Sequence, residues 1–153
     1  MIKVMFVCHG NICRSPMAEY VFKHMVREKG IEKNFIINSS ATSCEELGNP
    51  VHRGTKKKLY EMGIPCGDHR AVRFTKADYN AYDYIIAMDS NNLRNIDRII
   101  GEDSENKVHL LLDFTERKGQ NIADPWYTGN FDVTYNDIDE GCRGLIEYIN
   151  IKK

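Results

Sequence analysis

The chain has 153 residues, of which 42% are hydrophobic and 28% charged, and its formal net charge at pH 7 is −1. A chain of this length suits one domain, here residues 1–153, that is long enough to bury a core. Its balanced charge does not favour a nucleic-acid partner, and no apolar run approaches the roughly twenty residues of a membrane span. Nothing resembles a targeting segment, so we expect a cytoplasmic protein without a membrane partner. We expect it to be a monomer or a weak dimer.

The sequence contains five cysteines, an odd number with irregular spacing. Together with the lack of a secretory signal, this pattern favours reduced thiols over a framework of disulfides. No Cys-x-x-Cys is present, so neither a zinc knuckle nor a thioredoxin-type redox motif is available. We therefore expect neither a metal nor a cofactor.

The predicted elements alternate along the chain between strands and helices. Residues 2–7 form an apolar, β-branched run typical of a buried strand, and a helix is expected directly after it. Ser15 would cap this helix at its N-terminus, Pro16 fits its first position, and Gly30 would close it. Further strands are expected from residue 35, at 82–88 and from residue 107, with helices after Pro50 up to Gly63, from Asp89 and at 135–151.

Strands joined by helices of this length predict an α/β fold of three layers, with a four-stranded parallel sheet between helices on both faces. Ligands of such folds bind beyond the carboxyl ends of the strands, where the order of the strands reverses. Cys8 directly follows the first expected strand. The fold class therefore places Cys8 where a functional site is expected.

The segment CHGNICRS, from Cys8 to Ser15, joins this strand to the next helix. Backbone N–H groups at the start of a helix are unpaired and lie at the positive end of its dipole. With Gly10 allowing a tight bend, the loop would form a nest of N–H donors for an oxyanion, and Arg14 would add a planar fork. The same environment stabilises a thiolate, so Cys8 would attack a bound phosphate group and form a cysteinyl-phosphate. The expected phosphate-binding residues are His9, Gly10, Asn11, Ile12, Cys13 and Arg14.

A phosphate ester also needs a proton donor for its leaving oxygen. The segment ADPWY, after the fourth expected strand, offers Asp124 for this role, and Pro125 would stiffen the neighbouring backbone. Trp126 and Tyr127 could wall a pocket that receives a flat ring. Asp-Pro is common in ordinary turns, and the assignment gains weight because the fourth strand should end at the same rim as Cys8.

The segment VCHGNICRSPMAE resembles the signature of low-molecular-weight protein tyrosine phosphatases, which carry Cys-x4-Cys-Arg-Ser near the N-terminus. DPWY resembles the acid loop of that family, and the order of strands and helices matches over essentially the whole chain. The resemblance implies a two-step hydrolysis of tyrosine-phosphorylated proteins without a metal. Cys8 would be the nucleophile and Arg14 the phosphate clamp, and Asp124 would act first as general acid and then as base for the attacking water.

The resemblance also implies roles for the residues that support these three. Asn11 would hold the loop in a strained shape through polar partners that include Ser39, and Ser15 would donate to the sulfur of the nucleophile. Asp89 would brace the phosphate clamp. His69 matches another member of this network, although the spacing around GIPCGDHR is one residue longer than in the family.

Cys13 has two open interpretations. The resemblance implies that it is the partner of Cys8 in a reversible protective disulfide under oxidation. Packing within the loop is the alternative, and the residues alone do not decide between the two.

The expected wall of the substrate pocket consists of Ile12, Glu45, Trp126 and Tyr127. Some family members carry an aromatic residue in the loop after the second strand, where this chain reads SCEELGN. His9 stands where a small or apolar residue is common. Both departures concern peptide preference rather than the chemistry.

Protein arginine phosphatases share this fold and are the nearest alternative. They tend to carry threonine at the position of Ile12, whose apolar bulk favours an aryl ring. A thiol-dependent arsenate reductase would need two further cysteines near the end of the third strand, and no cysteine lies between Cys66 and Cys142. A cysteine phosphocarrier must keep its phosphate, for which an acid such as Asp124 and a clamp such as Arg14 are unhelpful.

Overall fold

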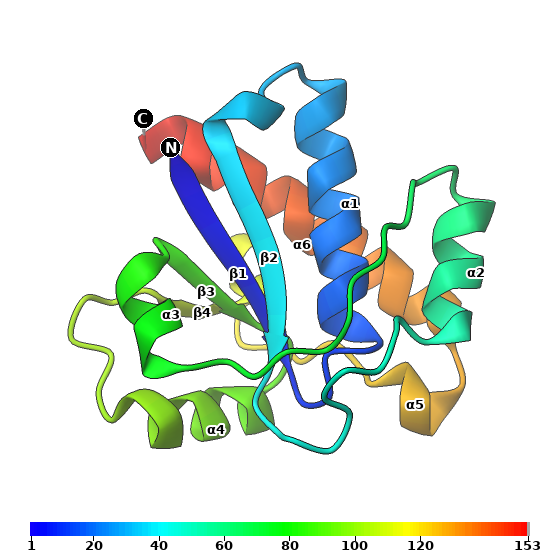
Figure 1. Cartoon of the computed structure of the whole chain (residues 1–153). Helices are drawn as coiled ribbons and strands as arrows, with labels where there is room; N and C mark the ends of the chain where they lie inside the picture. The colour runs from blue at the N-terminus through cyan, green and yellow to red at the C-terminus, as the bar shows by residue number, and fades with distance from the viewer. Residues whose placement is uncertain (153) are drawn as a thin grey trace.

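The computed structural model describes residues 1–152 (Figure 1). The expected domain of residues 1–153 includes Lys153, which lies outside the described residues. In chain order, the elements are β1 (Ile2–Cys8), α1 (Arg14–Glu28), η1 (Glu32–Asn34), β2 (Phe35–Ala41), α2 (Arg53–Glu61), α3 (Lys76–Ala81), β3 (Tyr84–Ala87), α4 (Ser90–Ile100), β4 (Val108–Leu110), η2 (Leu111–Phe114), α5 (Pro125–Thr128) and α6 (Phe131–Lys152).

The four strands form one parallel sheet in the order β2-β1-β3-β4. The chain passes from β1 outward to β2 and then returns to β3 on the other side of β1. The order of the strands therefore reverses between β1 and β3, and ligands of such sheets bind at this point. The α/β fold with a four-stranded parallel sheet, expected from the sequence, is confirmed.

Helices cover both faces of this sheet (Figure 1). Side chains alternate between the faces along a strand, so Phe6 and Val7 of β1 enter different parts of the core. On one face, Phe6 meets Phe22 of α1 edge-on, with 5.6 Å between ring centroids, and α6 completes the layer. On the other face, Val7 packs in a cluster with Ile96 and Ile100 of α4. A parallel sheet covered in this way exposes only its strand ends to ligands.

The start of α1 differs from the prediction. The helix begins at Arg14, and its N-cap is Cys13, which makes no side-chain cap hydrogen bond. The prediction that Ser15 caps the helix is therefore wrong. Ser15 lies inside the first turn and is fully buried, because its hydroxyl turns toward the loop before the helix.

Other boundaries shift for local reasons. The short helix α3 was not expected, although Thr75 and Asp78 form a capping box at its start. The last strand is short because η2 follows it directly, and the side chain of Asp113 accepts from the N–H of Leu110 at this junction. The expected loop around ADPWY contains the helix α5, and α6 begins already at Phe131.

Candidate active site

The loop between β1 and α1 carries the signature residues. Cys8 ends β1 and Arg14 begins α1, so the two residues are fixed by a central strand and by a helix packed on it. Asn11 adopts the left-handed region with φ of 60°. Asparagine tolerates this region better than most residues. The bend expected at Gly10 is present, since Gly10 lies within the bent segment of residues 9–13, and the residue of this segment with a positive φ is Asn11.

Asn11 is held in this conformation by hydrogen bonds at both ends of its buried amide. The Nδ2 group donates to Ser15 Oγ at 2.7 Å and to Ser39 Oγ at 3.0 Å. The Oδ1 atom accepts from His69 Nε2 at 2.7 Å and from the N–H of Val72 at 3.1 Å. Four partners from different parts of the chain therefore stabilise a strained backbone, as expected for a loop that must keep one shape.

The sulfur of Cys8 receives hydrogen bonds from the loop that surrounds it. The N–H of Asn11 donates to Cys8 Sγ at 3.3 Å, and Ser15 Oγ lies 3.0 Å from the sulfur. Since Ser15 Oγ accepts from Asn11, its own hydrogen is free to point at Cys8. Hydrogen-bond donors aimed at a sulfur favour the thiolate over the thiol, and the thiolate is the reactive form.

The guanidinium group of Arg14 is held by acceptors from two other segments of the chain. Its Nη1 donates to Asp89 Oδ2 at 2.7 Å and to the carbonyl of Ile122 at 2.9 Å, and only 3% of its side chain is exposed. Asp89 is the N-cap of α4 and follows β3, so the brace comes from the neighbouring strand. The opposite nitrogen, Nη2, lies 3.4 Å from Asp124 Oδ2. Burial and two fixed acceptors therefore hold the guanidinium in one orientation.

Asp124 faces this guanidinium from the segment before α5. Its Oδ1 accepts from the N–H of Trp126 at 3.0 Å, which makes it the N-cap of a helix that begins with Pro125. The same carboxylate thus caps a short helix and points an oxygen at Arg14. A carboxyl group in this place could exchange a proton with a ligand held by Arg14.

These residues line one pocket of about 120 Å³. Its walls bring together the expected phosphate loop and the expected substrate wall, and add Glu46. At the rim, His9 Nε2 lies 2.8 Å from Glu45 Oε2, and Trp126 and Tyr127 are 56% and 83% exposed. The lining residues are Cys8, His9, Gly10, Asn11, Ile12, Cys13, Arg14, Glu45, Glu46, Asp124, Trp126 and Tyr127.

Ser39, His69 and Glu19 form a layer behind the pocket. Ser39 Oγ donates to Glu19 Oε1 at 2.6 Å and lies 3.3 Å from His69 Nε2, so both expected residues, Ser39 and His69, do reach Asn11. Glu19 was not expected here. It is 2% exposed and is paired with Lys23 at 2.6 Å. A glutamate within a helix is an ordinary sequence feature, so only its burial reveals this role.

Burial lowers the pKa of His69 below its ordinary value of 6.5. Glu19, whose Oε1 lies 3.5 Å from Nδ1, opposes this shift, and Lys23 adds to it. Because Asn11 Oδ1 can only accept, the neutral imidazole donates to it from Nε2.

Cys13 lies beneath the pocket as a buried free cysteine. Burial, with the nearby Cys8 and Asp124, raises the pKa of its thiol to about 12. Thr55 Oγ1 donates to its backbone carbonyl at 3.2 Å. At neutral pH Cys13 is therefore a thiol, which packs against Ile12 and Ala71.

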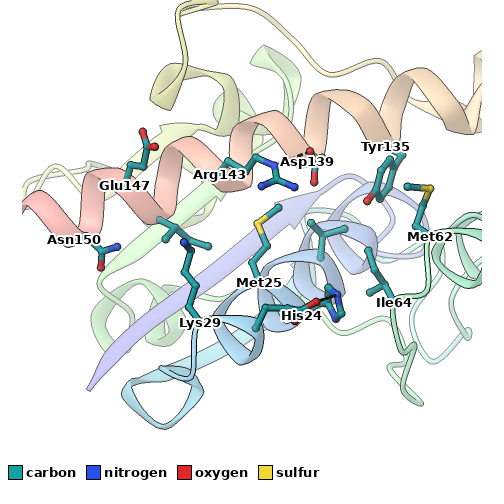
Figure 2. Close-up of a pocket in the computed structure, with 13 residues that line it drawn as sticks. His24, Met25, Lys29, Met62, Ile64, Tyr135, Asp139, Arg143, Glu147 and Asn150 are labelled. Carbon is teal, nitrogen blue, oxygen red and sulfur yellow. Dashed lines mark hydrogen bonds and ion pairs between the residues drawn. The ribbon is translucent and has the colours of Figure 1, made fainter.

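A larger groove of about 480 Å³ shares no lining residue with this pocket (Figure 2). Figure 2 shows side chains of α1, such as Met25, and of α6, such as Arg143, facing across it. Four of its ionic groups pair along their own helices: His24 with Glu28 at 3.1 Å, and Arg143 with Asp139 at 3.0 Å. None of the residues that line this groove is a cysteine, serine or threonine.

Within residues 1–152, no group of three or more His, Cys, Asp or Glu side chains is placed to hold a metal ion. In the same part of the chain, no helix has the length and apolar character needed to cross a membrane.

Comparison with known proteins places the chain among phosphatases. The family model "Low molecular weight phosphotyrosine protein phosphatase" matches residues 3–153. The low molecular weight protein-tyrosine-phosphatase YfkJ of Bacillus subtilis is 38% identical over 100% of this chain and 99% of its own, and its crystal structure superposes with a TM-score of 0.96. PtpA of Staphylococcus epidermidis, also named a low molecular weight protein-tyrosine-phosphatase, is 39% identical over 97% of this chain and 94% of its own.

One further solved structure bears on the alternatives considered from the sequence. The Drosophila arginine phosphatase DARP is 28% identical over 97% of this chain and 98% of its own, with a TM-score of 0.88. The two bacterial relatives are more similar in sequence, and both are named protein-tyrosine-phosphatases. With a family model that covers nearly the whole sequence, the chain belongs to the low molecular weight phosphotyrosine protein phosphatase family.

Proposed function

We propose that this chain hydrolyses phosphotyrosine in proteins, and small aryl phosphates, through a cysteinyl-phosphate intermediate and without a metal. One observation carries the proposal: Cys8, Arg14 and Asp124, from distant parts of the sequence, line the same pocket. A thiolate, a guanidinium fork and a carboxyl group are the nucleophile, the clamp and the acid that this reaction needs.

In the first step, the phosphate group sits in the loop of residues 9–13, and the Nη2 side of Arg14 binds its oxygens. The Cys8 thiolate attacks phosphorus, the bond to the phenolic oxygen breaks, and Asp124 gives its proton to that oxygen. The product is a neutral phenol and a phosphate bound covalently to sulfur. The fixed donors stabilise the charge that develops on the phosphoryl oxygens without having to reorient.

In the second step, the Asp124 carboxylate takes a proton from a water molecule, whose oxygen attacks phosphorus. The sulfur–phosphorus bond breaks, and Cys8 leaves as a thiolate. The hydrogen bond from Ser15, whose Oγ lies 3.0 Å from the sulfur, eases this departure because it stabilises the leaving charge. Inorganic phosphate and the starting state of both residues are recovered.

The substrate wall favours an aryl group over a guanidinium. Ile12 presents an apolar side chain to the pocket, and Trp126 and Tyr127 add aromatic surface at its rim. The acidic rim residue Glu45 would suit the guanidinium group of a phosphoarginine, and the likeness to the Drosophila arginine phosphatase also favours that substrate. Glu45 is, however, already paired with His9 at 2.8 Å. Phosphotyrosine is therefore the proposed substrate, and phosphoarginine is the alternative to be tested.

Cys13 keeps its proposed role as the redox partner of Cys8. A peroxide would oxidise Cys8 to a sulfenic acid, and the Cys13 thiolate would then attack that sulfur, so that the disulfide forms and the sulfenic oxygen leaves as water. Cys13 must ionise for this attack, and a pKa of about 12 makes its ionisation rare at neutral pH. Closure of the disulfide should therefore accelerate as the pH rises toward 12.

The proposal is tested by the turnover of a phosphotyrosine peptide and a matched phosphoarginine peptide in the presence of a chelator. We expect native protein to release phosphate from the phosphotyrosine peptide, and Cys8→Ser to release none. Undiminished turnover in Cys8→Ser would refute the cysteinyl-phosphate mechanism. Faster release from the phosphoarginine peptide would assign the enzyme to the alternative substrate.

A further inference from the structure

His52 lies where the phosphate loop and the acid segment meet. Its backbone N–H donates to the carbonyl of Ile12 at 2.8 Å, which connects His52 to the loop that would hold the phosphate. Its ring lies edge-on to Trp126, with 5.7 Å between centroids. One residue thus contacts both halves of the candidate site, although it does not line the pocket.

The ring of His52 is itself held in place. Its Nδ1 accepts from the N–H of Gly54 at 3.0 Å and so caps α2. Its face stacks on Phe131, the first residue of α6, at 5.5 Å with an interplanar angle of 21°. Phe131 lies so close to Gly54 that a Cβ there would meet the ring at 2.3 Å. Figure 1 shows α2, α5 and the start of α6 gathered at this side of the molecule.

Trp126, which His52 contacts, is itself hydrogen-bonded to the proposed acid, Asp124. The N–H of Trp126 donates to Asp124 Oδ1 at 3.0 Å, and Asp124 Oδ2 faces Arg14 at 3.4 Å. More than half of the Trp126 side chain is exposed, so it has few other contacts to fix it. Movement of its indole would move the peptide N–H that orients the carboxyl group.

We infer that His52 is a positioning residue, whose ring holds Trp126 and thereby aligns Asp124 with a phosphate bound in the loop of residues 9–13. This inference rests on the proposed function, because it assigns Asp124 as the acid. Small displacements of an acid cost much of its contribution to the rate, since proton transfer needs hydrogen-bond distance to the leaving oxygen.

Two substitutions distinguish the contact of the His52 ring with Trp126 from the capping of α2 by His52 Nδ1. His52→Asn keeps a side-chain acceptor for the N–H of Gly54 but removes the ring, and asparagine is a good N-cap. His52→Phe keeps a ring against Trp126 and Phe131 but removes the acceptor. A merely structural role in capping α2 would make His52→Phe the more damaging change. The inference requires the opposite order.

The experiment compares kcat/KM on phenyl phosphate, a poor leaving group, with kcat/KM on 4-nitrophenyl phosphate, an activated one. We expect His52→Asn to lose about tenfold or more on phenyl phosphate and less than about threefold on 4-nitrophenyl phosphate. His52→Phe should recover most of the selective loss. Added to Asp124→Ala, His52→Asn should cause no further selective loss, because both changes act on the same group.

Trp126 is the only tryptophan of the sequence, so its fluorescence reports on the same contact without activity. We expect acrylamide to quench it more strongly in His52→Asn than in the native protein or in His52→Phe. Equal losses on both substrates, or unchanged quenching in His52→Asn, would overturn the inference. If Asp124→Ala shows a selective loss and His52→Asn does not, the inference fails and the proposed function stands. If Asp124→Ala shows no selective loss, the acid role in the proposed function fails, and the inference fails with it.

Discussion

The candidate active-site pocket and the groove between α1 and α6 differ in the buried residues that support them. The groove is the larger, at about 480 Å³ against about 120 Å³, yet the buried residues of its lining are apolar or aromatic. At the pocket, Asn11, Arg14 and Ser15 are polar and buried, and each is hydrogen-bonded: Asn11 donates to Ser15, and Arg14 donates to Asp89. Burying polar groups is costly unless each is satisfied, so a fold that keeps them must hold them in fixed positions. Volume alone does not indicate a site here, whereas a satisfied buried network does.

Matched arginines in the two regions give the largest expected contrast. Arg14→Lys removes the planar fork and leaves Asp89 and the carbonyl of Ile122 with a shorter, differently shaped donor. We expect kcat/KM on a phosphotyrosine peptide to fall by about 10²–10³-fold. Arg143→Lys, in the groove, should leave the rate within about twofold, because Arg143 pairs with Asp139 on its own helix, away from the pocket.

Similar losses of activity in Arg14→Lys and Arg143→Lys would contradict the expected difference between the pocket and the groove. Steady-state kinetics on the same peptide, with circular dichroism to verify the fold of each variant, measures it. A large loss in Arg143→Lys would mean that the groove is coupled to catalysis.

The layer behind the pocket makes stability depend on pH. Burial lowers the pKa of His69 in the folded protein, so the unfolded chain binds a proton more readily. The contribution of neutral His69 is fully present above its ordinary pKa of 6.5 and is lost as the pH falls below that value. Native protein should therefore lose more stability between pH 7 and pH 5 than His69→Gln, which has no proton to bind. Urea unfolding across this range measures the difference, and identical pH slopes would contradict the role of His69.

The rim of the pocket should show the smallest effect. Glu45→Gln removes an exposed carboxylate next to His9, and exposed charges contribute little because solvent and salt screen them. We expect kcat/KM on phosphotyrosine peptides with basic neighbours to fall about two- to threefold, and that on peptides with acidic neighbours to rise by a similar factor. The difference should shrink at high salt. A change that does not depend on peptide charge would show that Glu45 acts through packing instead.

The parts of the site that could be predicted are contiguous in the sequence or follow from the fold class. Cys8 and Arg14 lie on one strand–loop–helix unit, and a parallel sheet must bring the ends of β1 and β3 together, which places Asp89 near Arg14. The nearly continuous apolar run of residues 2–7 also predicted a buried strand of a parallel sheet. These features depend on patterns that are local or topological.

The parts that could not be predicted depend on how particular side chains are satisfied. Ser15 looks like a helix cap in sequence, but its hydroxyl bonds to Asn11 and faces Cys8. Gly10 was expected to allow the bend of the loop, but nothing in the sequence shows that the next residue, Asn11, has a positive φ, which its side-chain partners stabilise. Glu19 is an ordinary helical glutamate until its burial against Ser39 is known. Such roles arise from tertiary contacts, which no local pattern contains.

The central claim is that Cys8 carries the phosphate during turnover. Rapid acid quenching of native protein mixed with a phosphotyrosine peptide, followed by peptide mass spectrometry, tests it most directly. We predict a phosphate on Cys8 within the first turnover, more of it in Asp124→Ala, where water is not activated, and none in Cys8→Ser. Turnover of the peptide without any phosphate on Cys8, or with phosphate trapped on another residue, would contradict the account.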